Sequence, residues 1–351
     1  MKKVLTLIAF SLGSLSVFSQ QDPQFSQFMH NKLFMNPGYA GMNHALCFTG
    51  IARQQWAGFD GSPRSGIFSA DCYVPQLSGG IGVNMMYDQL GFETNMGYRL
   101  NYSFHRDLGR GVLGMGVEMG AYSKRIGPGA GEQWTATTNW QIDPTIPPQL
   151  RTTVMDMGLG LWYERENMWC GISTSHLNGK LINDGTVLVD TIPHPMLYQM
   201  ARHYFITGGV NLLPGHTWEI RPSFIVKSDA TITSFDLNVT AMFNHTFWFG
   251  ASYRSGDAIC PMIGFQLVQK NGIFYSWIHT EANQPQLTDD QRSHQGGTLK
   301  MGFAYDYTTS HLKNYNNGTF ELFVNYCMPI EWKVKKEGHG DVRIIDRPDQ
   351  P

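Results

Sequence analysis

Residues 113–122 read Leu-Gly-Met-Gly-Val-Glu-Met-Gly-Ala-Tyr, and this stretch decides the fold class. Every second residue from Leu113 to Ala121 is apolar, while the residues between them are glycines and the carboxylate Glu118. A period of two residues is typical of a β-strand whose two faces meet different environments. We therefore interpret this stretch as a strand with one apolar face and one small, polar face.

The same alternation recurs from about residue 46 to residue 328, for example over 155–164, 235–244 and 300–308. In each segment the polar face mixes glycine with isolated charges and amides. A β-sandwich would instead show long solvated side chains on its outer face. Glycine and single charges suit the crowded lumen of a membrane barrel, where only alternate residues meet lipid.

The pattern predicts an all-β chain that forms a transmembrane antiparallel β-barrel of about 14 strands. The expected strands are 46–54, 65–74, 79–87, 95–105, 112–124, 153–164, 168–175, 202–211, 218–227, 234–244, 246–254, 258–269, 299–308 and 319–328. Membrane barrels have long loops outside and short turns in the periplasm. With both termini periplasmic, the long connections 125–152 and 176–201 fall outside. One connection breaks this rule, an insertion at about 270–298 that we read as an extra strand or a periplasmic excursion.

Composition agrees with a barrel and argues against a helical membrane protein, but a large soluble β-sandwich shares such averages, so composition alone does not decide the class. The chain is 13% aromatic and only 15% charged, and no apolar run beyond the first twenty residues reaches the roughly 18 needed for a membrane helix. A formal net charge of −2 offers no basic face for nucleic acid, so we expect no nucleic-acid partner.

The first residues predict export. Lys2 and Lys3 precede a short apolar stretch, and Ser19 ends a sequence suited to cleavage before Gln20. We therefore predict a signal peptide over 1–19 and an outer-membrane location. The expected organisation then has an N-terminal periplasmic collar or lumen plug (20–45), the barrel (46–328, with its insertion at about 270–298) and a periplasmic tail (329–351). The tail suits either a protein contact or plain disorder.

The polar faces carry charges that the barrel would enclose: Asp71, Glu118, Asp156, Asp236, Asp306 and Glu321 against Arg99, Arg221, Arg254 and Lys300. Charges between low-dielectric walls need partners. Two interpretations stay open, an interlocking salt-bridge filling of the lumen and a solute pathway.

The cysteines and the enzyme motifs give little chemistry. The five cysteines, at 47, 72, 170, 260 and 327, are scattered and odd in number, so we read them as small apolar strand residues, with a Cys47–Cys72 bridge as the alternative. The histidines lack metal-ligand spacing. Gly109 to Gly114 match G-x-G-x-x-G by letter but open a strand instead of a helix. We expect no cofactor, no metal and no enzymatic activity.

Several segments together resemble a known family. They are Gln21-Asp-Pro-Gln-Phe-Ser-Gln-Phe-Met29, Asn36-Pro-Gly-Tyr-Ala-Gly41, Arg53-Gln-Gln-Trp-Ala-Gly58, Gly61-Ser-Pro-Arg64, Arg202-His-Tyr-Phe205, Arg221-Pro-Ser-Phe224, Ser252-Tyr-Arg-Ser-Gly-Asp257 and Tyr305-Asp-Tyr-Thr-Thr-Ser310, followed by Asn314-Tyr315 and Gly318. In this order they resemble the PorP/SprF proteins, outer-membrane components of the Bacteroidetes type IX secretion system. The insertion and the tail depart from that pattern and leave the particular partner open.

The resemblance implies a role in protein secretion and gliding motility. The chain would support export and surface anchoring of adhesin-type cargo that carries a type B C-terminal domain. Implied partners are that cargo domain, translocon or periplasmic ring components, and outer-membrane lipid. The alternative function is a porin or hydrophobic-solute channel. Candidate lumen or partner residues, each of which also has a structural interpretation, are Arg53, Trp56, Arg64, Arg99, Glu118, Asp156, Arg221, Asp236, Arg254, Asp257 and Asp306.

Overall fold

The computed structural model describes residues 22–58, 61–127, 150–179, 181–189, 192–214, 216–270, 273–275 and 295–330. The expected signal peptide (1–19), most of the loop 125–152, much of the insertion 270–298 and the tail beyond residue 330 lie outside these residues.

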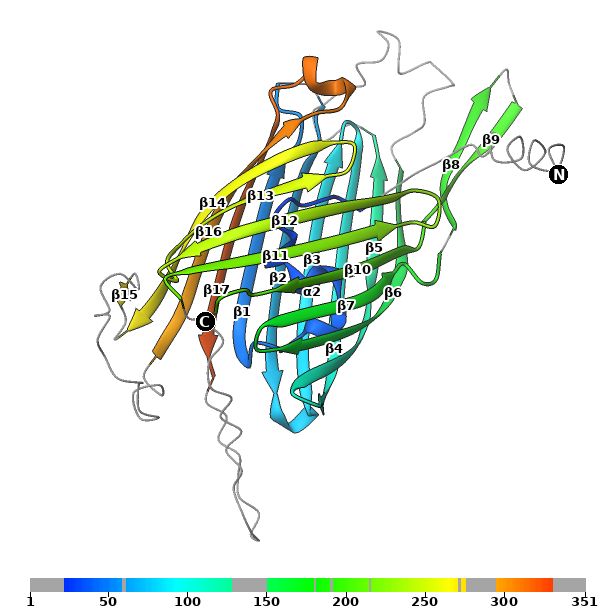
Figure 1. Ribbon diagram of the computed structural model, residues 1–351. Coiled ribbons are helices and arrows are strands. Elements are labelled where there is room, and N and C mark those ends of the chain that lie inside the picture. The colour runs from blue at the N-terminus through cyan, green and yellow to red at the C-terminus, as the bar shows by residue number, and fades with distance from the viewer. Residues whose placement is uncertain are drawn as a thin grey trace, which may run out of the picture.

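Within the described residues, fourteen antiparallel strands form one closed barrel, as Figure 1 shows. They are β1 (Ala45–Gln54), β2 (Arg64–Val74), β3 (Gly79–Leu90), β4 (Glu93–Leu108), β5 (Gly111–Ile126), β6 (Leu150–Arg165), β7 (Met168–Ser175), β10 (His203–Val210), β11 (Trp218–Ser228), β12 (Thr233–Phe243), β13 (Phe247–Arg254), β14 (Ala258–Lys270), β16 (Gln295–Thr308) and β17 (Thr319–Pro329). Neighbours along the chain pair with one another, and β1 pairs with β17 to close the ring. The predicted fold class is confirmed.

Two further elements lie in the connections. β8 (Leu181–Val189) and β9 (Ile192–Gln199) form a separate antiparallel hairpin inside the expected loop 176–201. In the insertion, the short strand β15 (Ile273–Tyr275) pairs with the end of β14. The described part of the insertion therefore extends the sheet at the end of β14.

The barrel has the two faces that the alternation predicts. Leu100 and Val117 point outward and are 69% and 49% exposed, while their neighbours Arg99 and Glu118 point inward and are 4% and 5% exposed. Because lipid surrounds the outside of a membrane barrel, the apolar face is the outer one and the charges are enclosed.

The strand connections differ in length between the two ends of the barrel. Residues 109–110 and 166–167 form two-residue turns at the end where β17 finishes, and 127–149 and 176–202 form the long connections at the opposite end. This agrees with the expectation that the long connections 125–152 and 176–201 lie at one end of the barrel and short turns at the other. The assignment of the short-turn end to the periplasm stays a prediction.

The helices are short. η1 (Phe28–His30), α2 (Lys32–Met35) and η2 (Pro37–Tyr39) precede β1, while η3 (Pro75–Leu77) follows β2 and η5 (His311–Asn314) follows β16. In the described part of the chain, no helix has the length and apolar character needed to cross a membrane.

Candidate functional site

Residues 22–44, here named the plug segment, lie inside the barrel, as the dark blue ribbon of Figure 1 shows. Their apolar side chains Phe25, Phe28, Leu33 and Phe34 are buried, although the inner wall around them is polar. Phe25, Phe28 and Phe34 cluster with wall residues that include Phe205. The lumen therefore contains a small apolar core built between the plug segment and the strands.

One group of buried charges holds the start of the plug segment against β16 and β17. The Glu321 carboxylate accepts hydrogen bonds from the backbone N–H groups of Ser26 and Gln27, each at 2.8 Å. The Ser26 hydroxyl donates to Asp306 at 2.7 Å. Neither carboxylate belongs to the plug segment, so the wall supplies the acceptors for its backbone N–H groups and for the Ser26 hydroxyl.

Two arginines neutralise these carboxylates. Arg53 reaches Asp306 at 2.7 Å and Glu321 at 3.0 Å. Arg254 reaches Asp236 at 3.0 Å and Asp306 at 3.4 Å. All of these side chains are at most 2% exposed. Buried charges persist only when they are paired and hydrogen-bonded, and this group, here named the Arg53–Arg254 cluster, meets that condition.

A second group of charges, here named the Arg99–His176 cluster, lies around Asp22. The His176 imidazole is 2.9 Å from Asp156 through Nδ1 and 3.1 Å from Asp22 through Nε2. Arg99 donates to Asp156 at 2.9 Å and lies 3.6 Å from Asp22. Glu118 stands 4.0 Å from Arg99. Asp22 of the plug segment is thereby tied to β4, β6 and the residue that follows β7.

The charges set the protonation of this cluster. Burial alone lowers the pKa of His176, but the Asp22 charge and hydrogen bonds to Asp156 and Asp22 outweigh it and raise the pKa to about 9. Burial raises the pKa of Asp22, but His176 and Arg99 hold it well below its ordinary range. His176 is therefore an imidazolium that donates to a carboxylate on each side.

The same place offers metal-ligand types. Donor atoms of Asp22, His176 and His203 lie within 4.8 Å of one another. However, Arg99 Nη2 is only 3.5 Å from His176 Nε2, and that guanidinium already supplies a positive charge there. Ion pairs account for Asp22 and His176, and His203 Nε2 accepts a hydrogen bond from the backbone N–H of Asp22 at 3.3 Å, so we interpret the group as a salt-bridged lock on the plug segment.

The Asn36-Pro-Gly turn of the plug segment lies against glycines of β5, β6 and β7. A Cβ added at Gly116 would stand 2.1 Å from the backbone N of Gly38, and one at Gly160 would stand 2.1 Å from the Asn36 side chain. The Asn36 amide donates to the carbonyl of Leu161 at 2.9 Å and accepts from Gly38 N at 2.9 Å. The glycine-rich lumen face exists here because the backbone of the plug segment needs that space.

The structure brings together seven of the eleven candidate residues in the two clusters: Arg53, Asp236, Arg254 and Asp306 in one, and Arg99, Glu118 and Asp156 in the other. Asp257 lies 3.6 Å from Arg254 at the rim of the first cluster. Arg221 also faces inward but pairs with Glu219 at 2.5 Å.

The remaining two candidates lie elsewhere. Trp56 is in the loop after β1, where its backbone N–H donates to Thr319 at 3.1 Å. Arg64 is exposed at the start of β2. Sequence reasoning missed the contribution of Asp22, Ser26 and His176. The segment that resembles the family already contained the first two, because Asp22 and Ser26 are its only carboxylate and its only hydroxyl.

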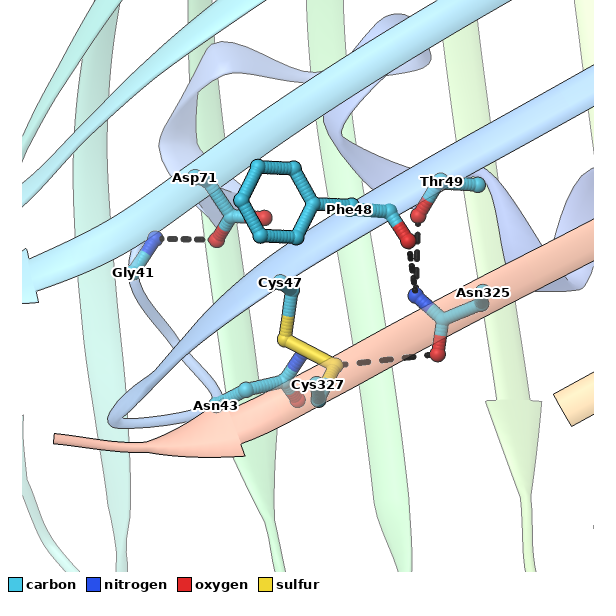
Figure 2. The surroundings of a disulfide bond; sticks show 8 residues. All are labelled: Gly41, Asn43, Cys47, Phe48, Thr49, Asp71, Asn325 and Cys327. Atoms are coloured by element: carbon cyan, nitrogen blue, oxygen red, sulfur yellow. Dashed lines mark hydrogen bonds between the residues drawn. A yellow bond between two sulfur atoms is a disulfide. The ribbon is translucent and has the colours of Figure 1, made fainter. Parts of the chain in front are cut away.

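The interpretation of the cysteines as free strand residues was wrong for Cys47 and Cys327, and the alternative Cys47–Cys72 bridge was wrong as well. Cys47 forms a disulfide with Cys327, as Figure 2 shows, and joins β1 to β17. The two residues stand directly opposite each other, whereas Cys47 faces Asp71 on β2. Cys72 is one residue out of register with Cys47, so its side chain points to the other face of the sheet. It stays free, as do Cys170 and Cys260.

A closed barrel with an apolar exterior and paired charges buried in its lumen defines an outer-membrane β-barrel protein. The chain belongs to the family of the type IX secretion system membrane protein PorP/SprF, whose pattern matches residues 17–326. It is thus a component of a secretion complex in the outer membrane. No curated protein sequence matches the chain.

Several solved structures are similar at low identity. The CymD monoaromatic hydrocarbon channel has a TM-score of 0.45 at 10% identity, covering 86% of this chain and 93% of that one. The P. putida toluene transporter TodX has a TM-score of 0.44 at 8% identity, covering 86% and 94%. A Pseudomonas aeruginosa FadL homologue has a TM-score of 0.42 at 8% identity, covering 80% and 89%. Such distant likenesses carry no inference about what this chain transports.

Proposed function

We propose that this protein is a non-enzymatic docking component of type IX secretion, which supports export and surface anchoring of adhesin-type cargo with a type B C-terminal domain. The observation that carries the proposal is the occupied lumen. Two salt-bridged clusters tie the plug segment to the barrel wall, at Glu321 and Asp306 on one side and at His176 on the other. A barrel filled by its own chain is better suited to binding at its ends than to passing solutes.

The long connections at one end of the barrel are the surface that we assign to cargo. The connection between β7 and β10 carries the hairpin β8–β9, and among the described residues these two strands pair only with each other. An extended segment of a partner can add to such an edge through backbone hydrogen bonds. The hairpin would therefore offer a strand-addition site for the cargo domain.

The opposite end would meet periplasmic components. Lys270, Gln295 and Pro329 all lie at the end where β14 finishes, β16 begins and β17 finishes. The insertion 270–298 and the tail 329–351 are therefore attached at the ends of neighbouring strands. We assign this pair of segments to contacts with the translocon or the periplasmic ring.

The proposal is tested by affinity purification from native outer membrane. The full chain should recover an adhesin and secretion components, and removal of residues 181–199 should lose the adhesin while keeping the secretion components. Deletion of the gene should abolish surface display of that adhesin and leave small-solute permeability unchanged. Recovery of neither class of partner, together with channel conductance in planar bilayers, would instead support the hydrophobic-solute channel.

A further inference from the structure

The outer face of the barrel has a groove over β1 and β2 with a volume of about 400 Å³. Its floor is made by small outward residues, Ala52 and Gly66, which stand opposite each other in the two strands. Its walls are large outward residues on the flanking strands, Leu322 on one side and Tyr87 on the other. Phe303 and Phe320 continue the first wall. The groove is therefore a two-strand depression in an otherwise bulky apolar surface.

Gly66 lines this groove, and Gly50 lies two residues before Ala52 on the same outward face of β1; both differ from the glycines of the lumen. A Cβ added at Gly50 would meet nothing within 4 Å, and one at Gly66 would meet only a carbonyl oxygen at 3.9 Å. Lumen glycines such as Gly116 are required by the plug segment, but nothing within the described chain requires glycine at positions 50 and 66. Glycine at these outward positions leaves the backbone of the two strands exposed to the membrane. A depression that no molecule fills would lose van der Waals contacts with its surroundings.

One end of the groove is polar. Gln54 and Arg64 stand opposite each other there, at the last residue of β1 and the first of β2. Arg64 is exposed, and no carboxylate of the described residues lies within ion-pair distance of its guanidinium. Phe320 and Tyr305 pack together beside this end at 5.2 Å, as in the aromatic girdles that mark a membrane interface. The groove thus runs from the interface into the apolar band.

We propose that this groove binds a phosphate-bearing anionic lipid, with an acyl chain over Gly50, Ala52 and Gly66 and the phosphate on Arg64. The outward face meets lipid, so a chain of methylene groups is the occupant that its apolar walls fit. Charge complementarity selects the headgroup, because the planar guanidinium of arginine binds phosphate with two parallel hydrogen bonds. Gln54 is beside it at the same level of the barrel.

The test uses the full mature chain, delipidated in detergent and titrated with phosphatidylglycerol and separately with uncharged diacylglycerol, with bound lipid counted by native mass spectrometry. We expect one saturable phosphatidylglycerol site that binds more tightly than diacylglycerol. Arg64→Gln should weaken phosphatidylglycerol about tenfold, the loss of one charge-assisted pair, and leave diacylglycerol unchanged. Gly66→Leu should fill the groove and abolish both.

Matched controls keep the result interpretable. Ala251→Leu enlarges another outward small residue, on β13, and Arg106→Gln removes another exposed arginine, on β4. Both should bind lipid like the wild type. Heat-dependent mobility on SDS gels verifies that each variant forms a barrel. Equal phosphatidylglycerol binding by the wild type, Arg64→Gln and Gly66→Leu would overturn the proposal. So would the absence of a saturable lipid site in the wild type, combined with the loss on Gly66→Leu of a protein that co-purifies with the wild-type chain.

Discussion

Cys47 and Cys327 are bonded across the seam where the first strand of the barrel meets the last, although 280 positions separate them in the sequence. The seam is the pairing that forms between the ends of the chain, so its closure needs the whole barrel. Arg53 of β1 and Glu321 of β17 bridge the same seam from the lumen side. One covalent bond and one buried ion pair thus lock β1 to β17.

Removing this disulfide should loosen the barrel. A crosslink that closes so long a loop restricts the unfolded chain, so Cys47→Ser with Cys327→Ser should destabilise the barrel by about 2–4 kcal/mol. The measurement is the temperature at which the compact band converts to the unfolded band on non-reducing SDS gels. Cys170→Ser, which changes an exposed free thiol, is the control and should convert at the wild-type temperature. An identical temperature for all three proteins would contradict the prediction.

Arg254→Met should be strongly destabilising. The change leaves Asp236 and Asp306 with one partner fewer in a site that is at most 2% exposed, and breaking such a buried pair costs about 3–5 kcal/mol. Denaturant unfolding in detergent measures the loss. Adding Asp236→Asn to the same chain removes one stranded charge and should restore part of the stability. No restoration would mean that the two residues are not coupled.

The pH dependence should follow His176. Its pKa is raised to about 9 from an ordinary value of 6.5, so the imidazolium contributes its full stability below pH 6.5. That contribution falls as the pH rises and is absent above about pH 9. We expect His176→Gln to lower the thermal midpoint most at pH 6 and least at pH 10. A difference between the two proteins that stays constant over this range would show that the ion pair with Asp22 contributes nothing.

Gly116→Ala should dislodge the Asn36-Pro-Gly turn, because the new methyl group would overlap the backbone of Gly38. We expect the plug segment to become cleavable by protease and the barrel to conduct ions in planar bilayers. Gly97→Ala is the matched control, since its methyl group would make ordinary contacts at 3.6 Å with Met86. Conductance equal to the control would show that the plug segment tolerates the change.

Much of the barrel could be predicted from the sequence because each strand carries its own signal. β7 spans Met168–Ser175 as predicted, and the predicted ends of most other strands lie within a few residues. The main differences are at the edges. β16 begins at Gln295 instead of 299, because it continues to pair with β14 beyond the predicted end. The hairpin β8–β9 was not predicted because it lies in a connection that was assigned as loop.

The sequence alone determined the fold class, since a period of two residues with glycine and charge on one face is a local property of each strand. The sequence alone also identified most of the charged residues that are buried in the lumen. Only the tertiary structure decided their partners. Asp22 meets His176 and Ser26 meets Asp306 because ring closure brings segments more than 150 residues apart to the same point in the lumen. The register at the seam likewise selected Cys327 over Cys72 as the partner of Cys47, and no local pattern contains that register.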